Sequence, residues 1–223
     1  YIYNVEQDEL RPALIRGKDF PRNIQSLATD QKNLYIGMKD EVGCYSFATS
    51  DYQVISHPEF FYISTLMLDS SESTLWIGNA HHLHRMNLNT KEIERVRDFY
   101  VVKSIAKDDN NLLIGTDNGL YVCDRQGTWH LISHDARNSQ SLSSNVVNMF
   151  FKDANGNIWI GTDNGISLAA HNPSIRSRSL FDITGSDEGC QISSIQRTVD
   201  STLWLGGSRG LIKLKTDMQG NNI

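Results

Sequence analysis

The chain has 223 residues, of which 39% are hydrophobic and 21% are charged, and its formal net charge is −5. This composition is typical of a globular domain with a sizeable core rather than of a disordered segment. The negative charge and the lack of any run of Lys or Arg argue against a nucleic-acid surface, and no apolar stretch is long enough to cross a membrane.

Two short strands are expected at the start of the chain, over residues 1–4 and 10–15. The sequence begins at Tyr1 with neither a methionine nor a signal sequence, which suggests a processed product or a piece of a longer protein.

One short phrase, Leu-Trp-Ile-Gly in its fullest form, then recurs five times, at residues 34–37, 75–78, 113–115, 158–161 and 203–206. Its glycines are 41, 37, 46 and 45 residues apart. A period near 40–45 residues is that of four-stranded propeller blades.

The same order of elements surrounds each phrase. An apolar segment with its key positions three apart, such as Val147 and Phe150, comes first and is expected to form the innermost strand. A turn rich in Asp and Asn, such as residues 153–157, leads into the phrase, and a second turn such as Asn164-Gly165 leads out of it. A third and a more variable fourth strand follow, and no segment has a sustained helical period. The predicted class is therefore all-β, a β-propeller of four-stranded blades.

The repeat divides the chain into four complete blades and two partial ones. The complete blades are expected at about residues 22–58, 59–98, 99–140 and 141–185, and the partial blades at residues 1–21 and 186–223. Both partial blades contain a third strand and so do not complement each other, which favours a segment of a larger propeller over a closed five-bladed ring. Trp76, Trp159 and Trp204 occupy equivalent positions and are expected to pack between blades.

Residues 141–147 and 153–166 resemble the two-component regulator propeller repeat, and residues 111–120 are a second close copy. Residues 40–43 and 79–83 depart from it, because the first is longer and the second lacks the turn glycine. The resemblance implies the periplasmic sensor region of a hybrid histidine kinase of the Bacteroidetes, a receptor for oligosaccharides released from a glycan. Its output would be a transmembrane segment, a kinase core and a DNA-binding regulator, none of which is recognisable in this sequence. The chain is thus expected to be a non-catalytic sensing or scaffolding module.

A ligand is expected on the loops that enter the innermost strands, around Arg22, Tyr62, Tyr100, Asn145 and Gln191. Aromatic rings with amide and guanidinium donors suit sugar rings, although each of these residues could also be an ordinary loop side chain. The other candidate place is a subunit or domain interface. The expected partners are an oligosaccharide, the rest of the sensor region and a second subunit in a homodimer, with no nucleic acid.

No metal, cofactor or catalytic group is expected. His81, His82 and His84 are the densest cluster of ligand-type residues, but nothing marks further ligands, so a histidine-rich turn is favoured. Residues 153–157 begin like a calcium loop but lack its glutamate, so a hairpin turn is favoured there too. Cys44, Cys123 and Cys190 are expected to be free thiols, although their redox state stays open.

Two alternatives remain open for the function. A glycan-active enzyme is conceivable because many enzymes share propeller folds, but no serine lies in a nucleophile-elbow context. A docking platform for proteins is the third possibility.

Overall fold

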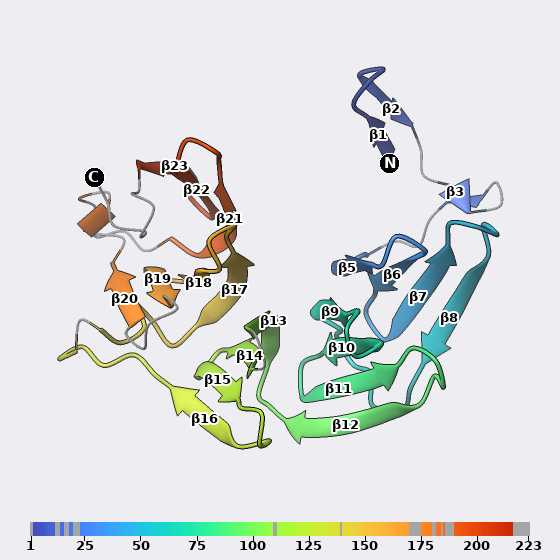
Figure 1. The fold of residues 1–223 in the computed structure, drawn as a ribbon, viewed down its shortest axis with the longest axis horizontal. Coiled ribbons are helices and arrows are strands. Elements are labelled where there is room, and N and C mark those ends of the chain that lie inside the picture. Colours follow the sequence, from blue (N-terminus) through green and yellow to red (C-terminus); the bar gives the residue numbers. More distant parts are fainter. Residues whose placement is uncertain are drawn as a thin grey trace. The chain divides into compact units, whose positions relative to one another are not determined.

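The computed structural model describes residues 2–11, 14–15, 18–19, 23–108, 111–138, 140–169, 175–179, 182–183, 185 and 190–215. Across these ranges the chain forms successive antiparallel sheets whose strands follow one another in chain order (Figure 1). The described part holds no helix with the length and hydropathy that a membrane crossing needs. The chain divides into two compact units, Tyr1–Asp98 and Phe99–Ile223.

The first unit contains two short hairpins followed by two four-stranded sheets. The hairpins pair β1 (Ile2–Asn4) with β2 (Glu9–Arg11) and β3 (Leu14–Ile15) with β4 (Lys18–Asp19). The sheets are β5 (Ser26–Thr29), β6 (Asn33–Gly37), β7 (Glu41–Ser46) and β8 (Tyr52–Ser56), then β9 (Thr65–Asp69), β10 (Thr74–Gly78), β11 (His82–Asn87) and β12 (Ile93–Asp98).

One expectation fails in the first hairpins. In place of a single strand over residues 10–15, β2 ends at Arg11 and β3 begins at Leu14. The next residue in the sequence after Arg11 is a proline, which has no N–H to donate to a strand ladder.

The second unit contains two four-stranded sheets and one three-stranded sheet. They are β13 (Val102–Asp108), β14 (Asn111–Thr116), β15 (Gly119–Cys123) and β16 (Trp129–Ile132); β17 (Val147–Lys152), β18 (Ile158–Thr162), β19 (Gly165–Ala169) and β20 (Ile175–Arg178); and β21 (Ile192–Arg197), β22 (Thr202–Gly207) and β23 (Gly210–Lys215).

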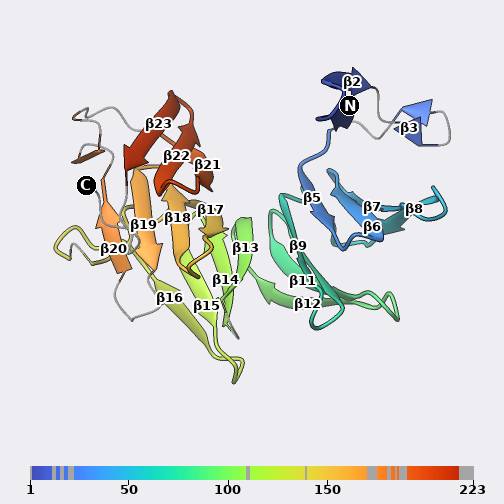
Figure 2. The same ribbon diagram turned by 45° about the horizontal axis from the view of Figure 1, so that its top comes forward.

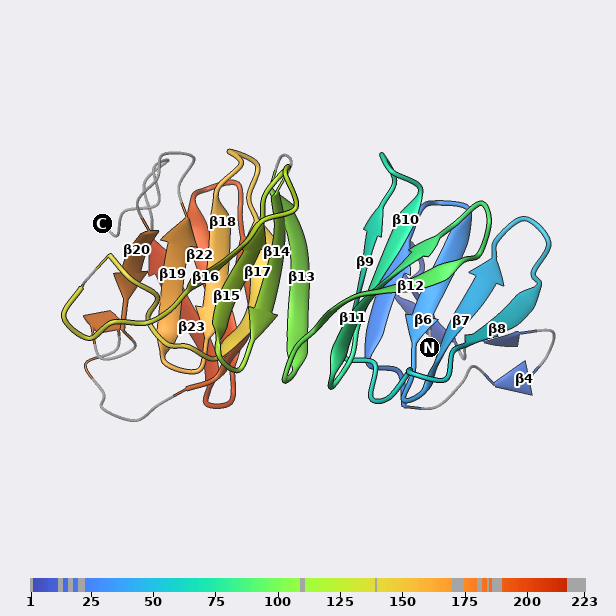
Figure 3. The ribbon, with the colours of Figure 1, turned by 90° about the horizontal axis from the view of Figure 1, so that it is seen from below.

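The first strands of neighbouring sheets lie side by side, as expected of innermost strands. In the second unit β13 packs on β17 and β17 on β21, and in the first unit β5 packs on β9. Figure 2 shows β13, β17 and β21 next to one another, and Figure 3 shows the sheets of the second unit stacked face to face. This radial stacking of four-stranded antiparallel sheets is the β-propeller architecture that the repeat predicts.

Apolar side chains fill the space between stacked sheets. Trp159 is only 2% exposed and packs against Ile192 and Leu205 of the following sheet. The sheet before it contributes Leu113 and Leu120 to a core with Ile160. Each sheet is therefore held chiefly by burial against its neighbours.

In three of the five repeat phrases, the closing glycine allows this close stacking. A Cβ atom on Gly161 would lie 3.0 Å from Cγ2 of Ile192, in the first strand of the next sheet. A Cβ atom on Gly115 would lie 2.7 Å from Cγ1 of Val147 and 2.9 Å from its carbonyl oxygen. The recurring glycine thus marks where one sheet contacts the first strand of the next.

The Asn-Gly turns after the phrase also have the predicted form. Gly119, Gly165 and Gly210 occupy the same turn position in three successive sheets, with φ of 116°, 111° and 114°. These dihedrals are accessible to glycine and strained for other residues. The turns therefore fix the register of the second and third strands.

Candidate functional site

One end of the second unit is organised around a buried carboxylate. Asp153 follows β17 in a tight turn, closed by the hydrogen bond from its backbone N–H to the carbonyl of Asn157 at 2.9 Å. Its Oδ1 accepts hydrogen bonds from the backbone N–H groups of Asn155 and Asn157. Its Oδ2 accepts from Trp159 Nε1 at 3.0 Å and from Arg197 Nη1 at 2.8 Å. The predicted hairpin turn is confirmed, and the carboxylate accepts hydrogen bonds from donors within the protein.

These hydrogen bonds control the ionisation of Asp153. Burial alone would raise its pKa, but the hydrogen bonds from Trp159 and Asn157 outweigh burial, so the pKa lies below its ordinary value. The side chains of Asp153 and Arg197 are 1% and 8% exposed, so the ion pair between the two sheets is buried.

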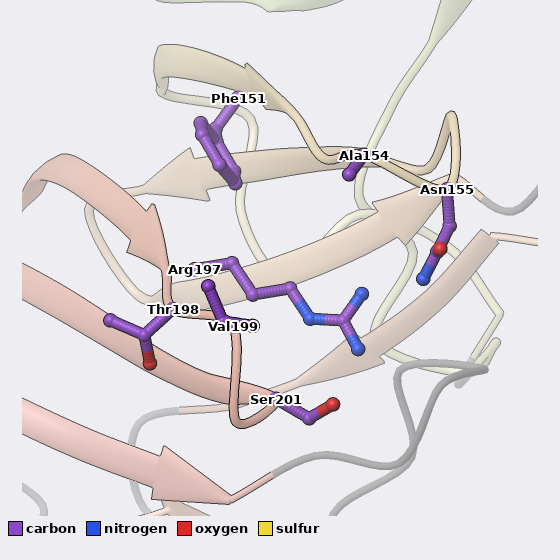
Figure 4. Close-up of a pocket in the computed structure, with 7 residues that line it drawn as sticks. All are labelled: Phe151, Ala154, Asn155, Arg197, Thr198, Val199 and Ser201. Carbon is purple, nitrogen blue, oxygen red and sulfur yellow. The ribbon is translucent and has the colours of Figure 1, made fainter.

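A pocket of about 370 Å³ opens beside this ion pair. It is lined by Phe151, Ala154, Asn155, Arg197, Thr198, Val199 and Ser201. Figure 4 shows the Arg197 side chain extending across it, between the turn that carries Asn155 and the turn that carries Ser201. Apolar side chains with an amide and hydroxyl groups form its wall, so it can accept a ligand of mixed polarity.

The opposite ends of the same first strands carry a polar network. The Lys103 ammonium lies 2.7 Å from Asp117 Oδ1 and donates to Asn148 Oδ1 at 3.2 Å. Gln191 Nε2 donates to the same Asn148 oxygen at 3.3 Å. This network links the first strands β13 and β17 with the loop that enters β21.

Two atoms beside the network are buried without a hydrogen-bond partner among the described residues, Asn148 Nδ2 and Asp163 Oδ1. The backbone N–H of Asp163 donates to the carbonyl of Val146, which places its turn beside the start of β17. An unsatisfied buried donor or acceptor costs about 1–3 kcal/mol. A ligand hydroxyl, which both donates and accepts, is suited to either atom.

β-Bulges direct these side chains. The register of β13 with β14 shifts between Val102 and Ser104, and that of β17 with β18 shifts between Val147 and Met149. The shift in the last sheet falls at the equivalent place, between Ile192 and Ser194. We call the three residues at these shifts, Lys103, Asn148 and Ser193, the bulge row. Bulges re-aim side chains and are common beside functional sites.

The residues predicted from the sequence are distributed over both units. Tyr62, in the first unit, is 53% exposed, has a φ of 52°, and lies with its ring 5.3 Å from the Lys39 ammonium. Tyr100, 79% exposed, precedes β13, and Gln191 precedes β21 in the second unit.

The other two predicted residues are Asn145 and Arg22. Asn145, which precedes β17, ties two loops together, because its Oδ1 accepts from the backbone of His134 and its carbonyl accepts from Gly119, both at 2.7 Å. Arg22 lies outside the described residues.

The structure therefore brings Gln191 together with Lys103, Asp117 and Asn148, which sequence reasoning missed. A signal for the bulge row was present, since each member is a polar residue directly after the first apolar residue of its strand.

The fold defines the chain as a β-propeller. Comparison with known proteins shows which propellers it is similar to. Residues 141–164 match the family model described as two component regulator propeller. The chain is similar to the extracellular domain of a B. thetaiotaomicron protein described as a hybrid two component system, BT4673, with 31% identity and a TM-score of 0.68 over 99% of this chain and 32% of that one. Both findings support the resemblance to two-component regulator propellers that the sequence indicated.

Two further likenesses concern the fold alone. The extracellular domain of BT3049 from B. thetaiotaomicron, described in the same way, has 19% identity and a TM-score of 0.70 over 90% of this chain and 28% of that one. PorZ, a component of the type-IX secretion system of Porphyromonas gingivalis, has 14% identity and a TM-score of 0.64 over 86% of this chain and 32% of that one. The chain spans about a third of the length of these structures. No curated protein matches it.

Proposed function

We propose that the chain is a non-catalytic, extracytoplasmic sensor module of a hybrid two-component system and that it detects glycan-derived oligosaccharides. The observation that carries the proposal is the likeness, at 31% identity over 99% of this chain, to an extracellular domain described as part of such a system. The signal would pass through the rest of the sensor region and a second subunit to a histidine kinase in the inner membrane, outside this chain.

The proposed ligand site is the bulge-row end of the second unit. It offers an ammonium, a carboxylate and amides within one network, and Asn148 Nδ2 and Asp163 Oδ1 are buried beside it without partners among the residues described. Tyr100 supplies an exposed aromatic ring before the same strands. Protein sites for small polar ligands combine such apolar surface with a few placed polar groups.

The test is a calorimetric titration of the 223-residue chain, and of a longer protein containing it, with plant, host and microbial oligosaccharides. We expect the chain to bind one class of sugar, which is recovered unchanged. Asn148→Ala should weaken binding by about 10-fold or more, because it removes hydrogen bonds worth about 1–3 kcal/mol. Asn155→Ala, in the pocket at the other end of the strands, is the matched control and should bind as the parent does.

Each outcome decides one part of the proposal. Loss of binding in Asn155→Ala with retention in Asn148→Ala would move the site to the pocket of Figure 4. Cleaved sugar would point to a glycan-active enzyme instead. Silence from both proteins across the panel would refute oligosaccharide sensing. Light scattering with and without sugar tests the proposed homodimer, which should form or tighten on binding.

A further inference from the structure

A fully buried histidine lies in the first unit, remote in sequence from the bulge row. His84 in β11 is 0% exposed, and its Nδ1 has no hydrogen-bond partner within the described ranges. The register of β11 with β12 shifts between Leu83 and His84, so an irregularity in the ladder falls where this side chain is placed. A buried polar atom without a partner is costly, and a shift of this kind is common beside functional sites.

Two other ligand-type side chains reach His84 from the loop that joins β8 to β9. Glu59 Oε2 lies 3.2 Å from His84 Nε2, and the ring of His57 lies 5.4 Å from that of His84, centroid to centroid. One ligand atom from each of His57, Glu59 and His84 lies within 4.8 Å of those of the other two. The sequence alone does not indicate this set, because Glu59 precedes His84 by 25 residues and the histidines adjacent to His84 in the sequence, His81 and His82, do not belong to it.

The contacts of Glu59 leave one of its oxygens available to a cation. Arg95 Nη1 lies 3.3 Å from the other carboxylate oxygen, Oε1, which leaves Oε2 directed at His84.

We propose that His57, Glu59 and His84 form a binding site for a divalent transition metal, with Zn²⁺ as the best fit. Two imidazoles and one carboxylate are a ligand set that zinc uses with a fourth position left open for water or a ligand. With bonds of about 2.0–2.2 Å, the ligand atoms of a tetrahedral zinc lie about 3.3–3.6 Å apart. The distance of 3.2 Å between Nε2 and Oε2 fits this spacing, and the His57 side chain must move closer.

Metal binding at His84 requires a change of tautomer and releases no proton. In the neutral form that donates to Glu59, the His84 proton lies on Nε2, and when the metal binds Nε2 this proton moves to Nδ1, so the imidazole stays neutral. Nδ1 of His57 accepts a long hydrogen bond of 3.3 Å from the backbone N–H of Glu59, so metal binding through its Nε2 would exchange only a weak contact.

The site would fasten a loop to a sheet. His57 and Glu59 belong to the segment between β8 and β9, which passes from one four-stranded sheet to the next, and His84 belongs to the third strand of the second sheet. Asn79 Nδ2 already donates to the carbonyl of Glu59 at 2.9 Å. A metal would add to this hydrogen bond and to the ion pair of Glu59 with Arg95, and would order the junction of the two sheets.

The test is zinc binding by the untagged 223-residue chain after treatment with a chelator. We expect one Zn²⁺ per chain by calorimetry, a higher Tm with zinc, and tetrahedral absorption bands on Co²⁺ substitution. His57→Ala, on the half-buried loop, should weaken binding by about 100-fold or more, since even groups that only orient a metal ligand are worth about 10–100-fold. Glu59→Gln should also weaken it.

His81→Ala is the matched control, because His81 is exposed, stacks on Phe61 and lies outside the set. It should bind zinc as the parent does. Absence of stoichiometric zinc binding in the folded parent chain would overturn the proposal. Equal weakening by His81→Ala and His57→Ala would also overturn it, because it would indicate diffuse binding to surface histidines. Sugar binding at the second unit is measured separately, so the two proposals can fail independently.

Discussion

Replacing Asp153 by asparagine tests whether the buried ion pair holds two sheets of the second unit together. Asparagine keeps Oδ1, and with it the hydrogen bonds from the backbone that shape the turn. It turns an NH₂ group toward three donors, from Asn157, Trp159 and Arg197, that all bind Oδ2 in the parent. The substitution therefore removes three hydrogen bonds and leaves a buried guanidinium without its counter-charge.

The expected loss is about 3–5 kcal/mol in the free energy of unfolding, the range for breaking a buried ion pair from one side. A loss of this size is a large part of the roughly 5–15 kcal/mol that stabilises a typical domain. Urea unfolding of the chain, followed by tryptophan fluorescence, measures it, because Trp159 itself contacts the carboxylate.

Asp200→Asn is the control, since Asp200 lies in the equivalent turn of the next sheet but is exposed and, among the described residues, accepts hydrogen bonds from its neighbours Thr198 and Thr202 alone. Asp200→Asn should lower the free energy of unfolding much less than Asp153→Asn does. If both variants lose the same small amount, the carboxylate of Asp153 only shapes its turn, and the cross-sheet role inferred from the structure is wrong.

Four further outcomes follow from the packing and the pKa shifts. The pKa of Asp153 is lowered on folding, so its contribution to the free energy of unfolding is present above its unfolded pKa and is lost as the pH falls through the folded pKa. The pH midpoint of acid unfolding should therefore shift in Asp153→Asn. Burial raises the pKa of Tyr35 to about 12, so its contribution to the free energy of unfolding is present below pH 10 and is lost as the pH rises toward 12. Tyrosinate absorbance and circular dichroism, recorded over the same alkaline titration, measure this loss. Gly161→Ala should cost roughly 1–3 kcal/mol by overpacking, and combining it with Ile192→Ala should cost less than the sum of the two; strict additivity would show that they do not clash. Burial raises the pKa of the Cys44 thiol, so alkylation at neutral pH should be slower in the folded chain than in urea, and equal rates would contradict its burial.

The repeated elements could be predicted because each has a local cause. The glycine of the phrase is required by the next sheet in three of the five copies, and the turn glycines such as Gly165 are required by their positive φ. A structural requirement that recurs from blade to blade also recurs in the sequence. The fold class and the order of strands could therefore be predicted. Trp204 shows the limit of this argument, because it is only half-buried while Trp159 is buried. Its strand lies in the last described sheet, so within the described residues no further sheet covers it.

The candidate sites were harder to predict because they depend on contacts between blades. Asn148 is joined to Lys103 and Gln191, which lie 45 and 43 residues away, and a bulge decides its direction. The polar residue after the first apolar residue of each strand marks the position, but it indicates neither the register shift nor the partner that the side chain reaches. The same holds for His84, whose partners come from a preceding loop. Lys103 and Gln191 are each separated from Asn148 by about one repeat period. That spacing is the sequence signal that would have predicted these contacts between blades.

The recurrence of the bulge at one place in three sheets has a consequence for how such a protein changes over time. Lys103, Asn148 and Ser193 hold the same position in their sheets, yet one is cationic, one is an amide and one is a small hydroxyl. The ladder on either side is made by the backbone, so it tolerates each of them. When a gene duplicates or exchanges blades, the backbone pairing is therefore retained and the bulge position is free to vary. Single-codon changes at that position can diversify the surface while the apolar core between sheets stays intact.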